Sequence, residues 1–206
     1  MTSTASAAGS YRRRPGVPAR PPFAFTATAP PGWEAFRGDA PGLRDDLVAL
    51  VARSAVWPAL TERQRLGLAN VMRSVAGVSA ATGAVATMLR VGSAAPGRAD
   101  AMPDVASLSL TWLRTAPVLA DLDLARLVVQ EGEPVDTGLG PGVVARRVES
   151  TPTGGEQITS QIAAPLPDSI WLAVLTGTSS ALEHAPAMEE ALHAVALSLQ
   201  VDRPPR

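Results

Sequence analysis

A serine-rich turn followed by a histidine is the stretch of this chain whose residue types could do chemistry. It runs LTGTSSALEH over residues 175–184, where Ser179 or Ser180 could meet His184 across the first turn of a helix. A hydroxyl beside a histidine base is the pair that nucleophilic acyl transfer requires. The stretch departs from the nucleophile elbow G-x-S-x-G, because residue 181 is alanine where that motif has its second glycine.

The same residues also have a structural interpretation. A catalytic histidine needs a third group to orient it, and Glu183 would point in a different direction on a helix because it is the adjacent residue. Hydroxyl side chains ahead of a helix cap its free N–H groups, and an acidic residue there favours the positive end of the helix dipole. We therefore expect Thr178, Ser179 or Ser180 to cap the last helix, and we predict no catalytic residue. A small serine hydrolase built on Ser179 and His184 is the alternative.

Neither a metal site nor a cofactor is predicted. His193 and His184 are two and a half helical turns apart, so within one helix they would point to opposite sides. Glu189 and His193 share a face, but two ligands without a third do not make a metal site. The run GLGPGVV, with glycines at 138, 140 and 142, lacks the following helix that a dinucleotide-binding loop requires, and Pro141 removes an N–H donor.

Two residue types are absent from the composition, and their absence excludes several chemistries. The chain has no cysteine, which removes thiolate nucleophiles, thiolate-bound zinc and disulfides. All 18 basic residues are arginine, so a P-loop lysine, a Schiff base and lysine-bound pyridoxal phosphate are excluded as well. The net charge of −1 gives no excess of positive charge for binding phosphates. We therefore expect no nucleic-acid partner.

The chain has no apolar run long enough to cross a bilayer, and its basic N-terminal segment has no apolar stretch behind it. These features predict a cytoplasmic protein without a membrane partner. Residues 1–22 are rich in Ser, Ala, Pro and Arg and are expected to be a disordered tail, and residues 203–206 a short C-terminal tail. A single domain is predicted over 23–202, with a long Pro/Gly loop at 92–104.

Hydrophobic periodicity divides that domain into strands and helices. A first strand is expected around Phe23 and Phe25, followed by a helix within 42–55 and a second helix that begins with the capping-box pair Thr61 and Gln64. Strands are expected over 83–92 and 104–115, then a helix over 117–130. Three strand-like runs at 143–150, 156–164 and 169–177 are joined by Pro/Gly turns, and a final helix is expected over 185–199.

Short turns between the last three strands indicate an antiparallel meander. The run at 169–177 is apolar on both faces, which predicts an interior strand covered on both sides, and the final helix should lie back across it. The fold class expected is α+β, with a mainly antiparallel sheet of about six strands packed by about four α-helices.

The opening strand followed by PPGW, and the closing segment from GVVARRVES to EEALHAVALSL, resemble the Mog1/PsbP-like α/β/α sandwich superfamily. The likeness covers about residues 23–202 in the order of elements and is sharp over roughly the last sixty residues. It implies that fold and a binding role, because members of the superfamily are mostly non-enzymatic; some bind a small GTPase and some dock on photosystem II. No partner-binding motif of those branches matches residue by residue here, and the lipobox cysteine of its lipoprotein-type members is missing.

Candidate binding residues come from two patterns. If the strands neighbour one another in register, one polar sheet face gathers side chains that could hold a partner or ligand; these are Ser107, Ser109, Thr111, Arg147, Gln157, Thr159 and Gln161. Trp33 follows a turn and Trp57 stands between two helices, and tryptophan is enriched at interface anchors as well as in cores.

We therefore expect a non-enzymatic protein-interaction domain that binds another protein and needs no cofactor. A homo-oligomer is compatible with this interpretation. The alternatives are the serine hydrolase and a small-ligand carrier that uses the polar sheet face.

Overall fold

The computed structural model describes residues 17–94, 103–115, 125, 132–150, 156–180 and 182–202. The strands are β1 (Val17–Pro18), β2 (Phe25–Thr26), β3 (Glu34–Arg37), β4 (Ala84–Ala94), β5 (Pro103–Arg114), β6 (Glu133–Thr137), β7 (Gly140–Ser150), β8 (Glu156–Pro165), β9 (Trp171–Ser179) and β10 (Gln200–Val201). The α-helices described are α1 (Leu43–Arg53), α2 (Glu62–Thr82) and α4 (Ala185–Ser198), with the 3-10 turns η1 (Trp57–Ala59) and η2 (Leu182–His184).

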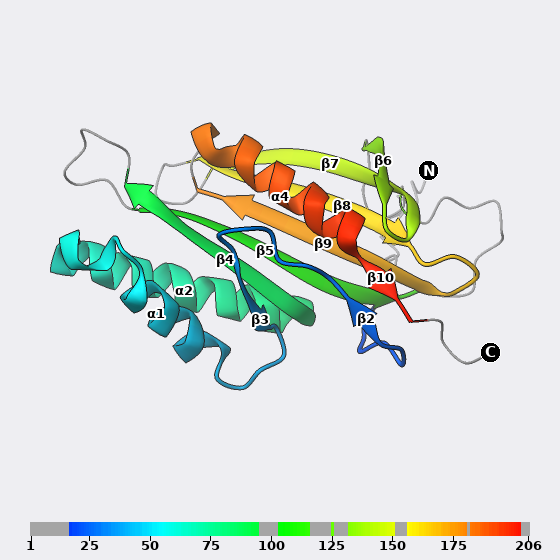
Figure 1. Ribbon diagram of the computed structural model, residues 1–206, viewed down its shortest axis with the longest axis horizontal. Helices are drawn as coiled ribbons and strands as arrows, with labels where there is room; N and C mark the ends of the chain where they lie inside the picture. The colour runs from blue at the N-terminus through cyan, green and yellow to red at the C-terminus, as the bar shows by residue number, and fades with distance from the viewer. Residues whose placement is uncertain are drawn as a thin grey trace, which may run out of the picture.

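Eight of these strands form one sheet. Seven follow the order β3-β4-β5-β9-β8-β7-β6, and β1 pairs with β5 beyond that path. Every pairing among the described strands is antiparallel, which confirms the α+β class with a mainly antiparallel sheet. Figure 1 shows α4 lying across β8 and β9, while α1 and α2 lie beside β4.

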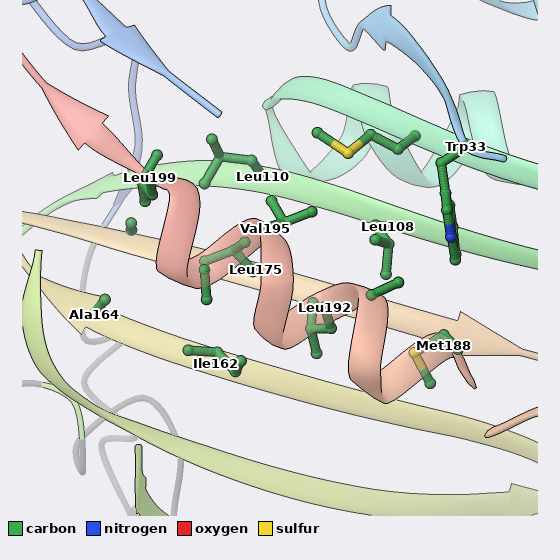
Figure 2. Close-up of a cluster of buried hydrophobic side chains, with 14 of the residues drawn as sticks. Trp33, Leu108, Leu110, Ile162, Ala164, Leu175, Met188, Leu192, Val195 and Leu199 are labelled. Atoms are coloured by element: carbon green, nitrogen blue, oxygen red, sulfur yellow. The ribbon is translucent and has the colours of Figure 1, made fainter. Parts of the chain in front are cut away.

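The face of the sheet beneath α4 holds the largest core. Alternation along β5 predicts that its even-numbered residues share one face, and Ala106, Leu108, Leu110 and Trp112 are all at most 2% exposed. The side of α4 that faces them is equally apolar; its buried residues include Met188, Leu192 and Val195, and Leu199 follows at its C-cap. Figure 2 shows these side chains meeting Leu175 of β9 and Ile162 of β8. The prediction that the last helix lies back across the meander is confirmed.

The opposite face of the sheet is covered over β4 and β5 by α1 and α2. Leu89 of β4 and Val105 of β5 pack there with Leu47, Leu68 and Met72 of the two helices. The predicted capping box opens α2, because the Thr61 amide donates to Gln64 Oε1 and the Gln64 amide donates to Thr61 Oγ1. Gly83 closes α2 in the left-handed conformation that glycine adopts without strain.

A third apolar cluster lies on that same face, over β7, β8 and β9. Ala125, which is helical, packs with four strand residues: Val143, Ala163, Leu172 and Val174. The helix predicted over 117–130 otherwise lies outside the described residues, so three of the four expected α-helices are described in full. Strand β9 runs between β5 and β8 with five consecutive buried residues, as its two-sided apolar pattern predicts.

Three strands of the main sheet were not predicted: β1, β3 and β6. β3 pairs with β4, and β6 pairs with β7. The glycine-rich run therefore contains the turn of a hairpin and continues into β7, which begins at Gly140. Gly138 lets this turn press against the end of α4: its amide donates to the carbonyl of Ala196, and a Cβ would collide with the carbonyl oxygens of Leu197 and Leu199.

The N-terminal part also differs from expectation. The first strand, β2, is only two residues long and pairs with β10 instead of joining the main sheet. Residues 17–22 fall in the predicted tail, yet Val17 and Pro18 pair with β5. The loop predicted over 92–104 is shorter at both ends, because β4 continues to Ala94 and β5 begins at Pro103; residues 95–102 lie outside the described residues.

Candidate functional site

A cluster of polar side chains lies on the sheet face opposite α4, between the two apolar clusters of that face. We call it the polar face and define it by Ser107 and Ser109 of β5, Thr176 and Thr178 of β9, Thr159 and Gln161 of β8, and Arg147 of β7. The register places Ser107 opposite Thr178, Thr178 opposite Thr159, and Thr159 opposite Arg147. A second row runs from Ser109 through Thr176 to Gln161. Four neighbouring strands therefore present two polar rows.

The polar face is partly fixed by its own hydrogen bonds. The hydroxyl groups of Ser107 and Thr178 lie 2.7 Å apart, and Gln161 Nε2 donates to Thr176 Oγ1 at 3.2 Å. The side chains of these rows are half-buried except Arg147, which is exposed. Because hydroxyl and amide groups have more than one donor or acceptor site, these bonds leave capacity for an external group.

The candidate residues named from the sequence divide between the polar face and the core. Ser109, Thr159, Gln161 and Arg147 come together as the register condition requires, but β9 lies between β5 and β8 and contributes Thr176 and Thr178, which sequence reasoning missed. Their signal was present as the alternation of Thr with Gly and Ser at the end of β9. Thr111 is 7% exposed and pairs with Val174. Gln157 is half-buried at the start of β8, opposite Glu149.

The two tryptophans are structural in placement. Trp33 is 7% exposed and belongs to the core beneath α4, where the Arg90 guanidinium lies 5.5 Å from the ring centre. Trp57 begins η1 and is half-buried against the α1 and α2 cluster, with the Arg65 guanidinium 5.4 Å from its ring. The turn before Trp33 directs its side chain inward, so it is not an accessible anchor.

A second polar cluster lies on the α4 side, at the end of the sheet where β5 begins. The Asp104 side chain is 4% exposed, and its Oδ2 atom lies 2.9 Å from His184 Nδ1 and 3.8 Å from a guanidinium nitrogen of Arg90. Sequence reasoning missed this contact because Asp104 and His184 are separated by most of the second half of the chain. No local pattern connects them.

Burial sets the protonation of this carboxyl group. Removal from water raises the pKa of Asp104 above its ordinary value of 3.8, and this outweighs His184 and Arg90, whose positive charges lower it. Glu183 adds to the rise because it is a nearby negative charge.

Asp104→Asn is expected to change how stability depends on pH. Because the pKa of Asp104 is raised in the folded protein, the stability that its proton contributes is complete below 3.8 and is lost as the pH rises through the folded pKa. The wild-type protein should therefore lose free energy of unfolding, relative to Asp104→Asn, between about pH 3.5 and pH 7. Urea denaturation of both proteins at the two pH values measures this; a difference that stays constant would contradict it.

The geometry at the serine-rich turn bears on the hydrolase alternative. Ser179 is 1% exposed at the end of β9, so its hydroxyl group is closed off from solvent. The predicted helix cap is wrong: Thr178 and Ser179 belong to β9, and η2 lies between them and α4. The N-cap of α4 is His184, which makes no capping hydrogen bond through its side chain, and Pro186 near the start needs no N–H partner.

Glu189 and His193 of α4 line a shallow surface depression with Glu190, Ala194 and Leu197. Glu189 is held by the sheet, since Ser160 Oγ donates to its Oε1 atom at 2.7 Å and Arg146 Nε lies 3.3 Å away. Within the described residues no three His, Asp or Glu side chains are placed to hold a metal ion. No described helix has the length and apolarity to span a bilayer.

Comparisons with known proteins give a distant structural likeness. No family model matches the chain, and no curated protein sequence matches it significantly. One solved structure, LpqN of Mycobacterium tuberculosis, described as involved in cell envelope biogenesis, is similar at 10% identity and a TM-score of 0.46, with 89% of this chain and 87% of that chain covered. A likeness of this size carries no conclusion on family or function, so the Mog1/PsbP-like assignment stays a prediction.

Proposed function

We propose that the protein is a non-catalytic interaction domain that binds another protein through the polar face. The observation that carries the proposal is the gathering of seven polar side chains from four strands on a sheet face whose flanks are covered by apolar packing.

The polar face has the properties of a prepared binding surface. Its internal hydrogen bonds, Ser107 to Thr178 and Gln161 to Thr176, restrict the side chains before a partner arrives, which lowers the entropy lost on binding. Arg147 stands exposed at one end of a row, and arginine is enriched at protein interfaces because its guanidinium group offers several donors. A partner that presents carboxylate and carbonyl oxygens would complement this surface.

Arg147→Gln is expected to weaken partner binding by roughly tenfold, the size of effect that truncating an arginine in an interface can have. Arg146→Gln is the matched control, because the two arginines are adjacent in β7 and point to opposite faces of the sheet. Affinity purification from the host cell, followed by titration of the recovered partner against both variants, measures the effect. Recovery of the protein alone, or equal loss in both variants, would overturn the proposal.

A small-ligand carrier that uses the same hydroxyl rows is the nearest alternative. Tight binding of a small molecule to the native state alone must raise the melting temperature, so a thermal-shift screen of polar metabolites distinguishes the two. A shift that Arg147→Gln abolishes would favour the carrier over the protein-binding domain.

The serine hydrolase has one observation in its favour, the Asp104 carboxylate beside His184 Nδ1, which is where an orienting acid stands in a catalytic relay. The burial of Ser179 counts against it. Survival of a measured esterase activity in Ser179→Ala would eliminate this candidate. The main proposal keeps the cytoplasmic location and the Mog1/PsbP-like fold expected from the sequence, and cell fractionation tests the former.

A further inference from the structure

Asp104 connects three segments that are distant in the chain. It stands at the start of β5, its Oδ2 atom faces Arg90 of β4 and His184 of η2, and Gly92 of β4 lies beside it without a side chain. Its other carboxylate oxygen, Oδ1, is buried without a hydrogen-bond partner. Within the described residues, the Asp104 carboxylate is therefore contacted by only two cationic side chains, Arg90 and His184.

Four charged or titratable side chains make up the cluster: Asp104 from β5, Arg90 from β4, and Glu183 and His184 from η2. Arg90 is the more distant of the two cations, at 3.8 Å, and its guanidinium also lies over the Trp33 ring. His184 makes the shorter contact, at 2.9 Å. Glu183 opposes the carboxylate because both carry negative charge.

The contact between His184 and Asp104 depends on charge. Nδ1 and Oδ2 lie 2.9 Å apart, and a positive charge on the ring adds Coulomb attraction to this contact. The His184 side chain is 37% exposed, although its Nδ1 atom, which faces Asp104, is buried. Histidine is the side chain that changes charge near neutral pH.

We propose that Asp104 and His184 form a pH-responsive latch, in which protonated His184 holds η2 against the start of β5 and loss of the proton releases η2. The released segment is short. Ala185 and Met188 at the start of α4 are fully buried and keep the helix in place, whereas Leu182 and Glu183 of η2 are exposed and anchor it weakly. The latch lies on the α4 side of the sheet and does not depend on the function proposed for the polar face.

Hydrogen exchange of the full-length protein tests the latch. After correction for the intrinsic exchange rate, the amides of residues 183–185 should be about tenfold better protected at about pH 5.5 than at about pH 8, relative to the amides of α2. His184→Gln should remove this difference. His193→Gln is the matched control, because His193 is half-buried on α4 and is not among the groups that act on the Asp104 carboxyl, and it should leave the difference intact.

The latch would be overturned by a wild-type protein whose η2 protection is the same at both pH values, or by His184→Gln retaining the difference. If His184→Gln does not fold, an NMR titration of the wild-type protein replaces it. The η2 amide signals should then follow the midpoint of the His184 ring signal, and following the midpoint of His193 instead would contradict the proposal.

Discussion

Leu192→Ala is expected to lower the free energy of unfolding by about 2–5 kcal/mol, the range for emptying a buried leucine site. Leu192 has no exposed surface and lies on the side of α4 that faces the sheet, as Figure 2 shows. The core there is continuous from α4 to β5, β9 and β8, so the surrounding side chains cannot collapse into the space without moving a strand. Urea denaturation followed by circular dichroism measures the change.

Leu197→Ala is the matched control in the same helix. Leu197 is 58% exposed, so the same truncation should change the free energy of unfolding by less than about 0.5 kcal/mol. Equal losses in both variants would mean that α4 does not pack on the sheet through the face described here.

Gly138→Ala is expected to destabilise the protein by about 1–3 kcal/mol through overpacking. The new methyl group would meet backbone carbonyl oxygens of Leu197 and Leu199, which cannot rotate away as a side chain could. The turn between β6 and β7 would have to move off the end of α4 and lose the hydrogen bond from the Gly138 amide to Ala196. Thermal and urea unfolding should both report this loss.

The corresponding control is Gly77→Ala in α2. A Cβ at Gly77 meets no atom within 4 Å, and alanine favours a helix interior over glycine by up to about 1 kcal/mol, so this variant should be as stable as the wild type or more stable. A destabilised Gly77→Ala beside an unaffected Gly138→Ala would contradict the packing of both helices.

Strong periodicity explains which parts of the fold could be predicted from the sequence. The alternation in β5 fixed both faces of that strand, and the Pro/Gly turns of the meander indicated the antiparallel pairing of β7, β8 and β9. The strands of the main sheet that were missed are short: β1 has two residues, and β3 and β6 lie at the edges of the sheet with mostly exposed residues. Their place depends on pairing with distant segments, which no local pattern records.

The candidate site could be predicted only in part from the sequence. Ser109, Thr159 and Gln161 could be assigned to one face from alternation alone, whereas the insertion of β9 between β5 and β8 required the sheet order. The Asp104 contact with His184 joins segments that are distant in sequence, and no local pattern in either segment records it. Trp33 follows a turn, which suggested an exposed interface anchor, but its side chain packs into the core.

Site-directed cross-linking tests the central claim, that the polar face is the docking surface, most directly. Because the chain has no cysteine, Thr159→Cys places a single photoreactive label on the polar face and Val148→Cys places one on the opposite face, where Val148 is 53% exposed. We predict that the label at residue 159 joins one partner protein in a host-cell extract, that Arg147→Gln reduces this product, and that the label at residue 148 does not form it. Equal cross-linking from both positions, or none from residue 159, would contradict the claim.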